Sequence, residues 1–96
     1  MSKYEVRNPL GDEQIAVSTV AKSLTVPSGA RGAVIQVCTN AIYWTDDGNT
    51  PSSSNGLEAN AGDIIEYMDK NYQTALKKFL AIQQSAAATL KVIYYD

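Results

Sequence analysis

The chain has 96 residues, with 45% hydrophobic and 19% charged side chains, a composition that indicates one globular domain rather than a disordered chain. A formal charge of −2 gives no electrostatic attraction to a phosphate backbone, so we do not expect nucleic acid as a partner. Because the chain has no histidine and a single cysteine, Ser–His and Cys–His catalysis, the common zinc sites and an internal disulfide are excluded. We therefore expect a non-enzymatic protein without a bound metal or cofactor.

The first 14 residues, MSKYEVRNPLGDEQ, differ in kind from the rest of the chain. They lack the apolar core of a signal peptide, and no run of about 18 apolar residues predicts a membrane-spanning helix anywhere in the sequence. Turn-forming residues surround a few isolated apolar ones, which predicts an N-terminal arm over residues 1–14 and a folded domain over residues 15–96. A frayed terminus or a peripheral strand is the alternative for the first segment.

Five later segments alternate apolar and polar side chains, with Gly, Pro, Asn and Asp between them. Alternation suits a pleated strand because successive side chains leave opposite faces of the sheet. Turn residues recurring roughly every 8–12 positions favour an all-β fold, an antiparallel β-sandwich or a barrel, in a single domain. The predicted strands cover residues 23–27, 33–39, 41–45, 62–68 and 89–95.

The segment NYQTALKKFLAIQQSAAATL, residues 71–90, fits two structures. Tyr72, Leu76 and Phe79 recur at helical spacing, and several residues here favour helix. Alternation of apolar side chains over residues 78–84 favours a strand instead. We expect the strand, preceded by one helical turn from Tyr72 to Leu76.

Two aromatic residues are followed by acids and a long polar loop in AIYWTDDGNTPSSSNG, residues 41–56. Trp44 shares a strand face with Ile42, which predicts a place in the core, whereas Tyr43 is expected to face outward. Asp46-Asp47-Gly48 has the chemistry of a tight turn, because aspartate accepts hydrogen bonds from following N–H groups and glycine supplies a positive φ. The acids are therefore predicted to serve chain reversal.

Three other functions are open to these side chains. Calcium would take oxygens from Asp46, Asp47 and Asn49, but EF-hand spacing from Asp46 requires glycine and glutamate where Pro51 and Leu57 stand. A carbohydrate platform would stack a sugar on an indole that lies outside the core. A carboxylate-dependent enzyme would have to draw on Asp46, Asp47, Asp63 and Glu66.

Six short motifs follow one another along residues 23–96: A-x-I-Q, W-x-D-D-G-x-x-P-[ST], G-L, G-[DE], F-x-A-I and L-x-V-x-Y-Y. The matching residues are Ala33 to Gln36, Trp44 to Ser52, Gly56-Leu57, Gly62-Asp63, Phe79 to Ile82 and Leu90 to Tyr95. In this order they resemble a recurring small accessory protein of tailed-bacteriophage particles. The first 22 residues lie outside the resemblance.

The resemblance implies a jelly-roll-like β-sandwich that binds the assembled phage particle and stabilises it, most simply as capsid decoration or cement, with a head–tail position as the other option. It implies the major capsid protein or another virion protein as partner, a homo-oligomer that could be a trimer, and synthesis in the host cytoplasm without a signal peptide. A carbohydrate-binding or host-adhesion module is the alternative function.

The expected contacts with a partner come from two parts of the chain. One part is the predicted arm, with its apolar side chains and one arginine. The other part is the end of the strand before the polar loop together with the first residues of that loop. These residues are Tyr4, Val6, Arg7, Leu10, Tyr43, Asp46, Asp47 and Asn49.

Overall fold

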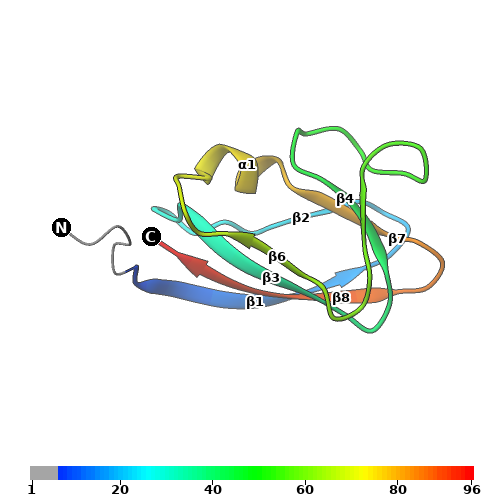
Figure 1. Cartoon of the computed structure of the whole chain (residues 1–96), viewed down its shortest axis with the longest axis horizontal. Helices are drawn as coiled ribbons and strands as arrows, with labels where there is room; N and C mark the ends of the chain where they lie inside the picture. The colour runs from blue at the N-terminus through cyan, green and yellow to red at the C-terminus, as the bar shows by residue number, and fades with distance from the viewer. Residues whose placement is uncertain (1–6) are drawn as a thin grey trace.

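The computed structural model describes residues 7–96, which form two antiparallel sheets of four strands each, packed face to face (Figure 1). The first sheet has the strand order β1-β8-β3-β6, and the second has the order β2-β7-β4-β5. The predicted all-β, antiparallel two-sheet architecture is confirmed. The strands are β1 (Pro9–Val17), β2 (Lys22–Ser23), β3 (Gly32–Cys38), β4 (Ile42–Thr45), β5 (Leu57–Ala59), β6 (Ile64–Tyr67), β7 (Leu80–Gln83) and β8 (Ala88–Tyr95).

The strands pair in a nested order, from the ends of the chain inward. β1 pairs with β8, β2 with β7, β3 with β6, and β4 with β5, all antiparallel. Further pairing of β3 with β8 and of β4 with β7 completes the two sheets. This order places the first and last described segments side by side. There the backbone N–H of Asn8 donates to Oδ1 of Asp96 at 3.0 Å, and the N–H of Asp96 donates to the carbonyl of Asn8 at 3.1 Å.

The core lies between the sheets and follows the alternation seen in the sequence. Ala33, Ile35 and Val37 of β3 are fully buried, and β8 contributes three nearly buried side chains beside them. Burying one such aliphatic side chain stabilises the fold by about 1.5–3 kcal/mol. The buried apolar side chains of each of these two strands therefore share one face of the period-two pattern.

The short helix α1 (Gln73–Lys78) joins the two sheets between β6 and β7 (Figure 1). It buries Leu76, and the chain then places Phe79 in the core before β7 begins. The predicted strand and the helical turn before it are both present, although the helix continues two residues further than expected. Within the described residues, no helix is long and apolar enough to cross a membrane.

The N-terminal segment is the main correction to the predicted organisation. From Pro9 to Gln14 the chain belongs to β1, where it pairs with β8 along the edge of the first sheet, so these residues are not an arm. The peripheral strand given as the alternative is what forms. Pro9 and Gly11 suggested a turn, but the register shifts between them, and a shift of this kind lets an edge strand accommodate both residues.

Candidate interaction surface

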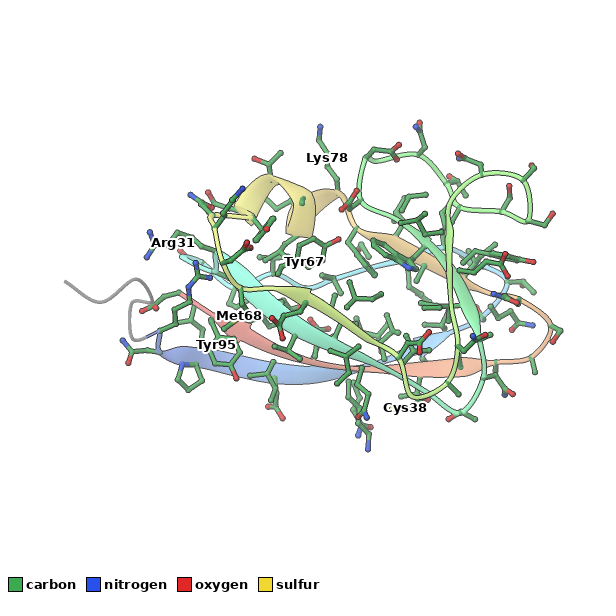
Figure 2. All side chains as sticks on the ribbon, viewed as in Figure 1. Arg31, Cys38, Tyr67, Met68, Lys78 and Tyr95 are labelled. Atoms are coloured by element: carbon green, nitrogen blue, oxygen red, sulfur yellow. The ribbon has the colours of Figure 1, made fainter. Side chains whose placement is uncertain are left out.

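The acids after β4 each hold a part of the surrounding structure in place. Asp46 is half-buried, and its Oδ2 accepts a hydrogen bond of 2.7 Å from the hydroxyl of Tyr67 in β6. Figure 2 shows Tyr67 in the space between the two sheets, below α1. Burial, and then the hydrogen bond to Asp46, raises the pKa of Tyr67 well above its ordinary value. Asp46 therefore ties the start of the polar loop to the opposite sheet.

Asp47 closes the turn that was predicted for it. The backbone N–H of Asn49 donates to its Oδ1 at 3.0 Å, and the side-chain amide of Asn49 donates to its Oδ2 at 3.1 Å. The backbone hydrogen bond holds the pKa of Asp47 below its usual range. Gly48 supplies the positive φ, at 87°. Within residues 7–96, no three Asp, Glu or Cys side chains form a group that could hold a metal ion.

Trp44 packs against the core, on the face predicted for it, but it is only partly buried. Its ring stacks on that of Phe79, with ring centroids 5.4 Å apart and planes 19° from parallel. The residue also lines a shallow depression together with both acids. The depression is lined by Trp44, Thr45, Asp46, Asp47, Asn55, Gly56 and Leu57.

Tyr43 faces away from the core, as predicted. It pairs with Glu58 of β5 on one side and with Ile82 of β7 on the other, and it is half-buried among them. Tyr43 and the polar loop therefore lie on or beside the second sheet.

Arg7 and Leu10 lie elsewhere, at the end of the molecule where β1 begins (Figure 1). Arg7 donates from Nη2 to the carbonyl of Lys70 at 2.9 Å, and its Nη1 is buried against Gly32 without a hydrogen-bond partner in the described part of the chain. Leu10 is 39% exposed. Tyr4 and Val6, the other two residues predicted for this contact, lie outside the described residues.

The predicted interface residues therefore do not form one site. The start of β1 and the loop after β4 lie at different ends of the molecule (Figure 1). Arg7 holds the backbone of its own chain, while Asp47 and Asn49 hold each other. Leu10 and Tyr43 are the two of these residues whose apolar surface remains available on the described part of the chain.

An exposed apolar patch that was not predicted as an interface lies on the outer face of the first sheet. Ile64 is 58% exposed and Ile93 is 43% exposed, and Val34 lies between their strands on the same face. We call this patch, with the polar residues around it, the outer sheet face. Its shallow hollow is lined by Asp12, Glu13, Gln14, Val34, Gln36, Ile64, Lys91 and Ile93.

The sequence did contain a signal for the outer sheet face. In a strand with one solvated face, the outward positions are expected to be polar. Val34, Ile64 and Ile93 break this rule in three different strands. Each is apolar, and each lies on the face of its strand that does not carry the buried side chains. Register then gathers them, because Val34 lies directly opposite Ile93. Without the register, the sequence does not show that these three side chains are neighbours on the sheet.

Comparison of the chain with family models, with curated proteins and with solved structures gave no match.

Proposed function

We propose that this chain is a non-enzymatic accessory protein of a phage particle, with a jelly-roll fold, that binds the assembled shell and stabilises it. The nested pairing supports this proposal: β1 with β8, β2 with β7, β3 with β6 and β4 with β5 is the order produced by rolling one long hairpin into two sheets. Jelly rolls of eight strands in two sheets recur in viral capsid and lectin domains. The motif order along residues 23–96 favours the first of these.

The outer sheet face is the surface we assign to the shell contact. It offers exposed Ile64 and Ile93 with Asp12 and Lys91 nearby, an apolar centre with charges at its margin. Contiguous exposed apolar groups with a polar surround are typical of protein–protein contact sites. This face is the observation on which the assignment of a binding role rests.

A patch with so few exposed apolar side chains implies a modest affinity for a single contact. An icosahedral shell repeats the contact many times, and a multivalent ligand binds far more tightly than one site does. A protein that binds the assembled shell and not its separated subunits stabilises the shell by mass action. The chain would then act without any chemical step.

Particles that lack this chain, mixed with the purified protein and then sedimented, test the proposal. We expect wild-type protein to sediment with the particles and the Ile93→Glu variant to remain in solution, because a carboxylate would be desolvated in the contact. Val20→Glu is the matched control, since Val20 is 66% exposed and lies between β1 and β2, away from this face. Failure of the wild type to sediment would contradict the function. Equal sedimentation of all three proteins would contradict only the assigned surface.

A carbohydrate-binding function is the second candidate, and the depression beside Trp44 favours it. An indole that is partly open, next to two carboxylates and the amide of Asn55, resembles the surroundings of a bound sugar. Binding on a glycan array that is lost in the Trp44→Leu variant would support this function, because leucine keeps an apolar contact with Phe79 and removes only the stacking ring. The Tyr43→Phe variant is the control, because it changes the outward side chain next to Trp44 in the same strand, and it should bind as the wild type does. Absence of wild-type binding to any glycan would exclude this candidate.

A further inference from the structure

The four edges of the two sheets differ in how far they are protected from pairing with another chain. β1 carries Pro9 and a register shift, two devices that disfavour further pairing. β2 has two residues and β5 has three, too few to form a ladder. β6, with the sequence Ile-Ile-Glu-Tyr, has four residues and contains neither proline, lysine nor a bulge. Among the described edges, β6 is therefore the one best suited to accept another strand.

The backbone of β6 directs its free groups outward at two known positions. In an antiparallel ladder, alternate residues direct both N–H and C=O toward the same neighbour. The N–H of Val37 in β3 donates to the carbonyl of Asp63 at 2.9 Å, so the residues at alternate positions after Asp63, Ile65 and Tyr67, are the ones that face β3. The N–H and C=O groups of Ile64 and Glu66 then point away from the sheet, toward solvent.

We propose that β6 pairs, edge to edge and antiparallel, with β6 of a second copy of this chain. The first sheets of the two copies, four strands each, then form one continuous sheet. Ile64 lies opposite Glu66 of the partner subunit, and Glu66 opposite Ile64 of the partner subunit. Each of these two pairs exchanges two backbone hydrogen bonds, so every free group of the two residues is used.

The side chains select this register over its neighbours. A pairing centred on Ile65 brings the two copies of that residue together on the inner face, where each is only partly covered by its own core. A pairing centred on Glu66 would place two carboxylates opposite each other, which is destabilising. A pairing centred on Ile64 would place Gly62 opposite Glu66 of the partner subunit, but Gly62 has a φ of 96° and lies outside the strand. The edge is therefore complementary to itself in one register.

A second copy fits the edge for a further reason, which is continuity of the exposed surface. Ile64 belongs both to β6 and to the outer sheet face, so the pairing joins the outer sheet faces of the two copies into one larger apolar surface. A ladder of this length lies well below the ~800 Å² per partner of a standard stable interface. The free dimer is therefore weak, and pairing becomes extensive when the local concentration is high. This proposal does not depend on the function assigned above.

Disulfide trapping in the purified protein, without any particles, tests the register. In a background with Cys38→Ser, the variants Ile65→Cys and Ile64→Cys are each equilibrated with a glutathione redox buffer. Two thiols lose two protons and two electrons, and glutathione disulfide accepts them to give two molecules of glutathione. At position 65 the Cα atoms of a non-hydrogen-bonded pair lie about 4.5 Å apart, within disulfide range. At position 64 they are diagonal neighbours, about 7–8 Å apart, which is too far for a bridge.

We expect at least ~10-fold more covalent dimer from Ile65→Cys than from Ile64→Cys, although position 64 is the more exposed of the two. Random collisions would give the opposite order. Adding Glu66→Pro to the Ile65→Cys variant should abolish the dimer, because it removes an outward N–H and leaves pairing with β3 intact. Equal or reversed trapping in the two cysteine variants, or full trapping with proline present, would overturn the proposal.

Amide hydrogen exchange in the wild type provides a readout that needs no substitution. The N–H groups of Ile64 and Glu66 should exchange more slowly as the protein concentration rises, while that of exposed Val20 should not change. Exchange at Ile64 and Glu66 that is independent of concentration up to the solubility limit would also overturn the proposal.

Discussion

At the scale of single residues, two buried tyrosines donate hydrogen bonds to carboxylates. The hydroxyl of Tyr94 in β8 donates to Oε2 of Glu13 in β1, and the same oxygen accepts the backbone N–H of Thr25 at 3.0 Å. Tyr67 of the first sheet donates in the same way to Asp46, which follows β4 of the second sheet. Each link satisfies a polar group that the fold buries, and leaving such a group unpaired costs about 1–3 kcal/mol.

These tyrosines predict a loss of stability at alkaline pH. Burial, and then the hydrogen bond to Glu13, raises the pKa of Tyr94, and burial with the Asp46 contact does the same for Tyr67. The unfolded chain releases these protons near pH 10, while the native state retains them, so the free energy of unfolding falls as the pH rises above about 10 and is unaffected by them below it.

Urea unfolding measures this dependence if it is followed from about pH 8 to about pH 11.5, a range that spans the ordinary tyrosine pKa of about 10. The wild type should lose stability above about pH 10, and the Tyr94→Phe variant should lose less over the same range, because it has one tyrosine fewer to titrate. The Tyr43→Phe variant is the control, because it removes a tyrosine hydroxyl that faces away from the core. Identical pH profiles for Tyr94→Phe and the wild type would show that the buried hydroxyl does not govern the alkaline limit.

Residue roles could be predicted from sequence where they depend on local chemistry. The turn at Asp47 was predicted correctly, because its partner Asn49 is two residues away. The link from Asp46 to Tyr67 was not predicted, because it joins residues 21 positions apart through the fold. Trp44 was assigned to the core from its alternation with Ile42, but alternation indicates only the direction of a side chain and not how completely its neighbours cover it.

At the scale of elements, the loop from residue 46 to residue 56 is packed against the end of β4. Pro51 is fully buried, and the hydroxyl of Thr45 donates to the carbonyl of Asn49. Gly56 closes the loop with a φ of 124°, and a Cβ there would lie 2.9 Å from the carbonyl oxygen of Trp44. The loop is therefore an ordered part of the second sheet's surface.

This packing predicts a large cost for Gly56→Ala. Alanine at a positive φ costs about 1–2 kcal/mol, and the clash with Trp44 should add roughly 1–3 kcal/mol. Gly29→Ala is the matched control, because Gly29 has a φ of 83° with nothing within 4 Å of the added Cβ. Urea unfolding of the two variants should give clearly lower stability for Gly56→Ala. Equal losses would mean that the loop is loosely held.

Elements with strong alternation could be predicted, and those with mixed chemistry could not. β3 and β8 combine alternating apolar positions with clear turn signals, so their places along the chain were predicted. β1 was missed because Pro9 and Gly11 are turn residues in most contexts, and only its pairing with β8 makes this segment a strand. The outer sheet face was missed because it depends on register between strands, which local patterns do not contain.

At the scale of the whole molecule, the fold is defined by contacts between distant parts of the chain. β1 pairs with β8, and hydrogen bonds between Asn8 and Asp96 join the two ends. The all-β class could be predicted from the sequence. The nested strand order could not, because no local pattern indicates that the first strand lies beside the last one. That order brings β8, β3 and β6 side by side, and the outer sheet face lies on these strands.

The central claim is that this open face, and no chemical group, carries the function. Electron cryo-microscopy of phage particles assembled in the presence of this chain, the partner that we propose for it, tests this claim most directly. The account predicts repeated density on the particle that fits the two-sheet domain, with the strands β1, β8, β3 and β6 turned toward the shell and Ile64 and Ile93 in the contact. Particles that lack the chain, or a domain bound with that face open to solvent, would contradict it.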